Sequence, residues 1–196
     1  MTNALLVIDA QKIYTNRKSE MFCKDAAGTI QRINKLIEAF SERKLPVIYI
    51  RHQHKKSGSD AGNLFDYEGT GESEGISFIE GSEEVQYDQD LVVKKPTREI
   101  VKTRYSAFKN TSLSDTLKSL KVSRIAICGF MTNFCCESTA REAFDLDYFV
   151  DFIVDATGTP GTDNFDEKKI RTVVSELLGA GFARVFETKK YLKEVK

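Results

Sequence analysis

The sequence predicts an α/β fold, a three-layer α/β/α sandwich around a mostly parallel, six-stranded, Rossmann-like sheet. Two observations support this prediction. Six short apolar runs occur along the 196 residues, and most are separated by segments whose apolar residues recur at helical spacing. Strands that alternate with helices form parallel sheets covered on both faces. The length suits a single domain over residues 1–196, and we find no internal repeat.

The apolar runs give the expected strands in chain order. The first, Ala4–Ile8, is rich in branched residues and suits a strand buried on both faces. The others are Pro46–Ile50, Glu99–Lys102, Arg124–Cys128, Phe149–Val154 and Arg184–Glu187. With strand order 3-2-1-4-5-6, the first and fourth strands are neighbours, and ligands bind beyond their carboxyl ends at that switch in order.

Three segments between the strands show helical spacing of apolar residues. One covers residues 29–43, one follows a candidate cap at Ser112, and the clearest is closed by Gly179 and Gly181. We expect all three apolar stripes to face the core. Their members are Ile30, Ile33, Ile37 and Phe40; Leu113, Leu117 and Leu120; and Ile170, Val173, Val174, Leu177 and Leu178.

Composition excludes several classes of function. Lys plus Arg and Asp plus Glu both number 29, so a nucleic-acid partner is not expected. No apolar run approaches the roughly 20 residues that span a bilayer, and the N-terminus lacks a secretory pattern, so we expect a cytoplasmic protein. The four cysteines are irregularly spaced and form no CxxC pair, which argues against disulfides and a thiolate zinc site. Without GxGxxG or a P-loop, no nucleotide cofactor is expected.

Three reactive side chains follow predicted strands. Cys135 comes after the fourth strand, near the start of a helix-like segment, where free N–H groups and the helix dipole favour a thiolate. Asp9 follows the first strand directly, and Lys102 ends another. Each has a plainer interpretation: a buried structural cysteine, a helix-capping or turn aspartate and a solvated lysine. Together they form a set able to perform nucleophilic chemistry, and the strand order brings Asp9 and Cys135 together.

The chain resembles the isochorismatase-like cysteine hydrolases, which include nicotinamidases and N-carbamoylsarcosine amidohydrolases. Three blocks carry the resemblance in order along nearly the whole chain. They are Leu6-Val7-Ile8-Asp9-Ala10-Gln11; Lys102-Thr103-Arg104-Tyr105-Ser106-Ala107-Phe108 with Thr111 and Leu113; and Gly129-Phe130-Met131-Thr132-Asn133-Phe134-Cys135 with Thr139-Ala140-Arg141 and Asp155-Ala156-Thr157.

The resemblance implies a catalytic triad. Cys135 would be the nucleophile, Asp9 would accept and return the proton, and Lys102 would hold both by charge. Cys136 competes for the first role, but the family places the nucleophile three residues after the threonine, here Thr132. The resemblance also implies a cis peptide bond between Phe130 and Met131, and an oxyanion hole made by the amides of Met131 and Cys135.

The implied activity is hydrolysis of a C–N bond in a small amide, carbamoyl or ureido compound through a thioester. Isochorismatase-type hydrolysis of a vinyl ether is the first alternative, although family members with that chemistry generally lack the cysteine. A binding protein on the same fold is the second. Candidate substrate-binding residues lie beside the motifs: Gln11, Tyr14, Tyr105, Phe108, Asn133 and Phe134.

Two further features leave alternatives open. Residues 57–85 form a long glycine-rich, acidic stretch, which is either a mobile surface loop or, as the resemblance implies, a specificity loop, partly serving a neighbouring subunit. Nicotinamidases hold a metal through Asp-x-His and later histidines. Here His52 stands at the Asp position, His54 matches the His, and no later histidine exists. Two histidines alone rarely hold a metal, so no metal is expected, and a metal site would need Asp60 or Asp66 as a further ligand. Either histidine could line the pocket instead. The family commonly forms dimers or higher homo-oligomers.

Overall fold

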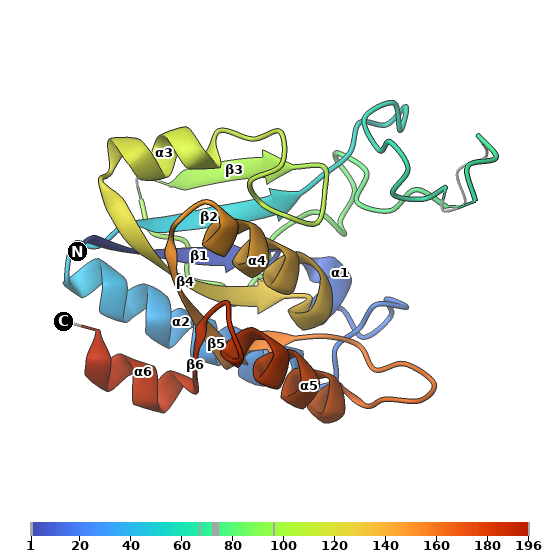
Figure 1. Cartoon of the computed structure of the whole chain (residues 1–196). Coiled ribbons are helices and arrows are strands. Elements are labelled where there is room, and N and C mark those ends of the chain that lie inside the picture. Colours follow the sequence, from blue (N-terminus) through green and yellow to red (C-terminus); the bar gives the residue numbers. More distant parts are fainter. Residues whose placement is uncertain (1, 67, 72–74, 96, 196) are drawn as a thin grey trace.

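The computed structural model describes residues 2–66, 68–71, 75–95 and 97–195 (Figure 1). Six parallel strands form one sheet in the order β3-β2-β1-β4-β5-β6, which is the predicted order. The strands are β1 (Thr2–Ile8), β2 (Val47–His52), β3 (Arg98–Lys102), β4 (Val122–Phe130), β5 (Phe149–Gly158) and β6 (Arg184–Phe186). The α/β prediction is therefore confirmed.

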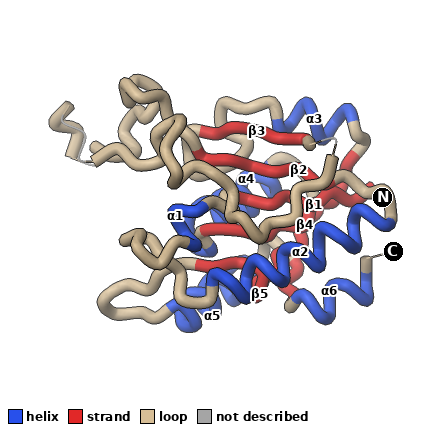
Figure 2. The backbone as a smooth tube through the Cα atoms, turned by 180° about the vertical axis from the view of Figure 1, so that it is seen from behind, coloured by secondary structure: helices blue, strands red, loops and turns tan. Residues whose placement is uncertain are grey.

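Helices cover both faces of the sheet and bury two apolar layers against it. The helices α1 (Lys12–Thr15), α2 (Ala26–Glu42) and α6 (Thr188–Glu194) cover one face, and Figure 2 shows α2 and α6 crossing it. The other face carries α3 (Leu113–Ser119), α4 (Glu137–Asp145) and α5 (Glu167–Gly179). A π-helical turn, η1 (Thr132–Cys136), leads from β4 directly into α4. None of the helices in the described part of the chain is both long and apolar enough to span a membrane.

Strand register brings the carboxyl ends of four strands to one edge. Ile8, the last residue of β1, lies opposite Ile50 of β2 and Gly129 of β4. His52 of β2 in turn lies opposite Lys102, the last residue of β3. Whatever follows β1, β3 and β4 therefore converges at the switch in strand order, as the sequence predicted.

β4 passes β1 so closely that only glycine fits at the contact. Gly129 has φ of +123°, and a Cβ added there would lie 1.8 Å from the carbonyl oxygen of Ile8. The close approach fixes the end of β4, and hence the start of the η1 turn, against the end of β1.

Several predicted boundaries were wrong by a few residues. β1 and β3 begin earlier than predicted, at Thr2 and Arg98, and β2 runs on to His52. β4 and β5 extend beyond their apolar runs, because backbone pairing continues through Gly129 opposite Thr157. β6 ends at Phe186, one residue short of Glu187, and the brief helices α1 and α6 were not predicted. On α5, Val173 and Leu177 are 43% and 52% exposed, so the predicted core stripe is wider than the face that the sheet covers.

Candidate active site

Asp9, Lys102 and Cys135 meet at the edge of the sheet where the strands end. The Lys102 ammonium Nζ lies 2.8 Å from Asp9 Oδ2 and 3.2 Å from Cys135 Sγ. It also donates to the carbonyl oxygen of Arg104, at 3.0 Å. The side chains of Asp9 and Lys102 are fully buried, and Cys135 is 2% exposed. The ammonium therefore bridges a carboxylate and a thiol in a site that largely excludes water.

Burial dominates the protonation of this cluster. It raises the pKa of Asp9, although the neighbouring Lys102 charge opposes the change. It likewise raises the pKa of the Cys135 thiol to about 12, because the opposing Lys102 charge is partly cancelled by Asp9. Burial disfavours the Lys102 ammonium, but the Asp9 and Cys135 charges outweigh it and raise the pKa of Lys102. At neutral pH the cluster thus holds an ion pair beside a protonated thiol.

This result departs from the prediction of a resident thiolate. Cys135 does lie in the turn that opens α4, as predicted. Desolvation is the largest cause that raises the pKa of Cys135, and a thiolate beside the Asp9–Lys102 ion pair would leave a net negative charge buried. The thiol can become a nucleophile by passing its proton to Asp9, whose raised pKa suits it to receive one.

The backbone before Cys135 contains the cis peptide bond that the resemblance implied. The Phe130–Met131 peptide bond is cis. Among the described residues, the amide of Met131 donates to no hydrogen-bond acceptor, whereas its carbonyl accepts from the amides of Phe134 and Cys136. A free N–H group in a buried turn beside a thiol is available to a developing oxyanion.

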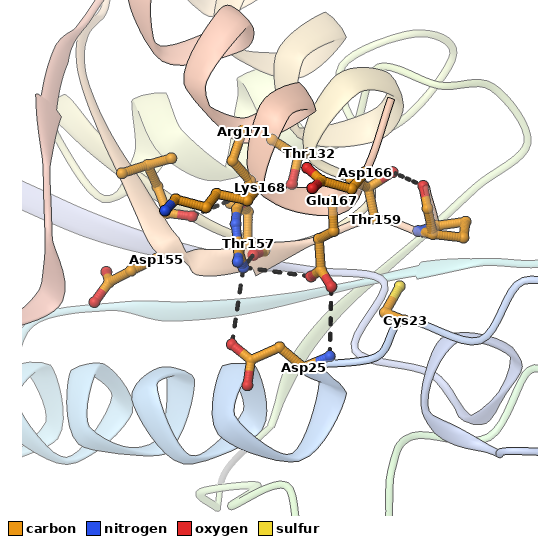
Figure 3. A network of polar contacts seen from close by, with 12 residues as sticks. Cys23, Asp25, Thr132, Asp155, Thr157, Thr159, Asp166, Glu167, Lys168 and Arg171 are labelled. Carbon is orange, nitrogen blue, oxygen red and sulfur yellow. Dashed lines mark hydrogen bonds and ion pairs between the residues drawn. The ribbon is translucent and has the colours of Figure 1, made fainter. Parts of the chain in front are cut away.

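A polar network anchors the η1 turn to β5 and α5. Thr132 Oγ1 donates to Thr157 Oγ1 at 2.8 Å, and Thr159 Oγ1 donates to Asn133 Oδ1 at 2.7 Å. Arg171 of α5 donates to the carbonyl of Thr157 at 3.2 Å (Figure 3). The turn is therefore fixed on the side away from Lys102.

Arg171 continues the network towards α2. It contacts Glu167 Oε1 at 3.3 Å and Asp25 Oδ2 at 3.8 Å, and Glu167 Oε2 accepts from the amide of Asp25 (Figure 3). The start of α2 and the start of α5 thus support the same end of β5.

Cys135 opens onto a small cavity of about 150 Å³. Its walls are mostly apolar and aromatic, which favours a small planar ligand. Three predicted substrate-binding residues lie on the wall: Tyr14, Tyr105 and Phe134. The remaining lining residues are Met21, His52, Leu64, Phe65, Phe78 and Met131. Cys136, by contrast, is fully buried in the core beneath α4, and this placement favours Cys135 as the reactive thiol.

The other three predicted substrate-binding residues do not line the cavity. The Gln11 amide is occupied by the backbone of His52, through N–H and C=O bonds of 2.9 Å each, and by Val85. Phe108 is 6% exposed and packs in the core on the α3 side of the sheet. Asn133 is held by Thr159. Gln11, Phe108 and Asn133 therefore hold neighbouring segments of the protein in place and do not line the cavity.

The long loop supplies wall residues that motif spacing did not reveal. Leu64, Phe65 and Phe78 come from residues 57–85, of which 67 and 72–74 lie outside the described residues. The loop is bound to the end of β2: the amide of His54 donates to Phe78 at 2.8 Å, and the amide of Glu80 donates to His54 at 2.8 Å. The family resemblance, which implied a specificity loop over residues 57–85, was the sequence feature that could have pointed to these wall residues.

The two histidines do not form a good metal site. His52 Nε2 and His54 Nε2 lie 3.1 Å apart and share a hydrogen bond, and Asp60 stands at the opposite nitrogen of His54. Asp66 instead accepts from the amides of Thr70 and Gly71.

The cluster of Asp9, Lys102 and Cys135 is no better suited to a cation. Asp9, His52 and Cys135 offer donor atoms within 4.8 Å of one another. The Lys102 ammonium already neutralises Asp9 and contacts the thiol, so it would repel a metal ion there.

Asp9, Lys102 and Cys135 thus form a buried cluster at the edge of a parallel α/β sheet, which is the arrangement that the resemblance implied. The family model for the isochorismatase domain matches residues 3–189, so the chain belongs to that family, as its motifs indicated. Nicotinamidase 3 of Arabidopsis thaliana is 36% identical over 163 residues, which cover 80% of this chain and 73% of the relative. Ureidoacrylate amidohydrolase RutB of Agrobacterium fabrum is 27% identical over 87% of this chain and 82% of its own length.

A solved structure supports the same assignment. A cysteine hydrolase from Pseudomonas syringae pv. phaseolicola superposes with a TM-score of 0.88 at 26% identity, covering 97% of this chain and 91% of the other.

Proposed function

We propose that this hydrolase of the isochorismatase family cleaves a C–N bond of a small amide or ureido compound, with Cys135 as nucleophile. One observation carries the proposal: the Cys135 thiol opens onto the cavity while touching the ammonium that pairs with Asp9. A nucleophile, a proton acceptor and a fixed positive charge are the groups that acyl transfer from nitrogen requires.

The first half of the reaction would acylate the enzyme. The substrate carbonyl lies over Cys135 Sγ, with its oxygen towards the Met131 and Cys135 amides. Asp9 takes the thiol proton as sulfur bonds to the carbonyl carbon. The resulting oxyanion collapses, the C–N bond breaks, and Asp9 returns the proton to the departing nitrogen. An amine or ammonia leaves, and a thioester remains.

The second half would release the acid. A water molecule enters the place vacated by the amine, Asp9 takes its proton, and the oxygen attacks the thioester carbon. The C–S bond then breaks, and the proton returns to sulfur. Lys102 stays charged throughout and keeps Asp9 and Cys135 within reach of each other. A protonated resting thiol protects the nucleophile until a substrate displaces water from the cavity.

The substrate class follows from the cavity and the relatives together. A space of about 150 Å³ with aromatic walls suits a small planar acyl group. The relatives are named for nicotinamide and for ureidoacrylate, which are both small and planar around the carbonyl. Nicotinamide and ureidoacrylate are therefore the first two compounds to assay.

Release of ammonia from these compounds tests the proposal. Wild type should be active on at least one of them, Cys135→Ala and Asp9→Asn should lose at least about a thousandfold in kcat/KM, and Cys136→Ala should retain activity. Circular dichroism verifies that each variant is folded. Activity of folded Cys135→Ala comparable to wild type would refute the mechanism. Cleavage of a vinyl ether, or ligand binding with no turnover, would favour the two alternatives.

We also propose a homo-oligomer that resides in the cytoplasm. Exposed apolar side chains on neighbouring helices support the first part, namely Phe144 at 46% on α4 with Val173 and Leu177 on α5. All four cysteines are free, which suits a reducing compartment. Sedimentation analysis should show a species larger than 22.1 kDa, and Leu177→Glu should reduce its mass. A wild-type monomer would contradict the proposal.

A further inference from the structure

A chain of three polar side chains leads from the loop surface into the cavity. Asp60 Oδ1 lies 3.4 Å from His54 Nδ1, and His54 Nε2 lies 3.1 Å from His52 Nε2. Both imidazoles are buried, and the His52 ring stacks on Phe78 with centroids 4.3 Å apart. Each ring is thus held in place by groups on both sides.

The contacts between Asp60, His54 and His52 determine which nitrogen of each imidazole ring carries a proton. Burial lowers the pKa of both histidines, so both rings are neutral near pH 7. His54 Nδ1 forms no hydrogen bond of ordinary geometry with the described residues, but it lies 3.4 Å from Asp60 Oδ1, and a carboxylate, which only accepts, favours the tautomer with the proton on Nδ1. His54 Nε2 is then an acceptor, and the proton of His52 is on Nε2. His52 Nδ1 is consequently unprotonated and can only accept a hydrogen bond through its lone pair.

That lone pair has no partner in the described part of the protein. His52 Nδ1 is buried and receives no hydrogen bond there. His52 lines the cavity, and one of its ring nitrogens lies within 4.8 Å of both a carboxylate oxygen of Asp9 and Cys135 Sγ. A buried acceptor left unpaired costs about 1–3 kcal/mol, which a ligand donor can recover.

We propose that His52 is a specificity residue whose Nδ1 accepts a hydrogen bond from a substrate N–H group, and that Asp60 and His54 hold it in the accepting tautomer. The inference rests on the proposed function and narrows its substrate class. Primary amides and ureido compounds carry the required donor beside the carbonyl. Esters of the same acid do not, and a site built around a hydrogen-bonding group discriminates against ligands that lack its partner.

The tautomers can be observed directly by NMR, because the protein contains only these two histidines and their signals are therefore easy to separate. A two-bond ¹H–¹⁵N spectrum of the wild-type protein at pH 7 should show His52 protonated on Nε2 and His54 on Nδ1. Asp60→Ala should give a mixture of tautomers at both rings, because it removes the carboxylate oxygen that faces His54 Nδ1. Asp60→Asn is not suitable, because Asp60 Oδ1 both accepts from the amide of Lys55 and faces His54, so an amide oxygen at that position would still accept from His54. A wild-type His52 protonated on Nδ1 would overturn the inference.

Selectivity between nicotinamide and methyl nicotinate tests the role in recognition. The two compounds share one acyl group and differ in the donor. We expect the amide-to-ester ratio of kcat/KM to fall about tenfold in His52→Leu and by a smaller factor in Asp60→Ala, in which part of the protein retains the accepting tautomer. Glu80→Gln is the matched control: it removes a carboxylate that contacts the amide of Lys56, and it should leave the ratio unchanged.

The two hypotheses fail in different ways. Hydrolysis of neither nicotinamide nor ureidoacrylate by the wild-type protein would refute the proposed function, and the spectrum would still decide the tautomer. Hydrolysis with the same ratio in wild type, His52→Leu and Asp60→Ala would overturn the role of His52 alone. Asp60→Ala keeps this test valid even if the core change at His52 prevents folding, because Asp60 lies outside the cavity wall.

Discussion

Replacing Lys102 with Met should destabilise the protein far more than the loss of an ordinary ion pair. Lys102 and Asp9 are both fully buried, with Nζ and Oδ2 2.8 Å apart. The substitution leaves the Asp9 charge buried without its partner, and breaking a buried pair in this way typically costs about 3–5 kcal/mol. That is a large fraction of the roughly 5–15 kcal/mol by which a domain is stable.

The loss should depend on pH with a definite sign. Burial already raises the pKa of Asp9 in the folded protein, and removing Lys102 takes away the charge that opposes this. The folded variant then binds a proton more tightly than its unfolded chain. Its free energy of unfolding is therefore greatest below the unfolded pKa of about 3.9 and falls by up to about 1.4 kcal/mol per pH unit until pH passes the folded pKa.

Urea denaturation at pH 5 and pH 8 measures both effects. The destabilisation of Lys102→Met should be larger at pH 8 than at pH 5. Adding Asp9→Asn should recover most of it, since the unpaired charge is gone. Lys12→Met, which removes an exposed 3.0 Å pair with Glu83, should cost less than about 1 kcal/mol at either pH. Equal losses at both pH values, or a double variant no more stable than Lys102→Met, would refute the reasoning.

Three further predictions concern the close approach, the anchor and the thiol. Gly129→Ala should abolish soluble folded protein, because its Cβ would meet β1 at 1.8 Å, whereas Gly181→Ala, with no atom within 4 Å, should fold as judged by circular dichroism. Thr157→Val should cost about 1 kcal/mol in urea denaturation and lower kcat more than it raises KM, because the 2.8 Å bond from Thr132 is lost. Alkylation of Cys135 by iodoacetamide should keep accelerating through pH 9 without a plateau, because burial raises its pKa to about 12; a plateau below pH 8 would contradict this.

The strand order and the meeting of three side chains could be predicted because both depend on local patterns. Apolar runs located the strands, and parallel pairing placed the ends of β1, β3 and β4 at one edge. Asp9 and Lys102 follow from that placement together with the motifs. Strand ends were less predictable, because backbone pairing through Thr157 does not require an apolar side chain.

Features that depend on the depth of burial could not be predicted. A position near a helix start suggested a lowered pKa for Cys135, but burial of the thiol raises its pKa instead. The contribution of Phe65 and Phe78 depends on the path of a long loop back to β2, which no spacing rule gives. Gln11 stands beside a motif like a binding residue, yet the backbone of His52 occupies its amide.

In the proposed mechanism, Cys135 carries the acyl group during turnover. Acid quenching within the first turnovers, followed by peptide mass spectrometry, measures this with nicotinamide or ureidoacrylate, whichever the wild-type protein hydrolyses. We expect an acyl adduct on the peptide at Cys135, absent in Cys135→Ala and retained in Cys136→Ala. Turnover with no adduct on Cys135 and undiminished activity in Cys135→Ala would contradict it.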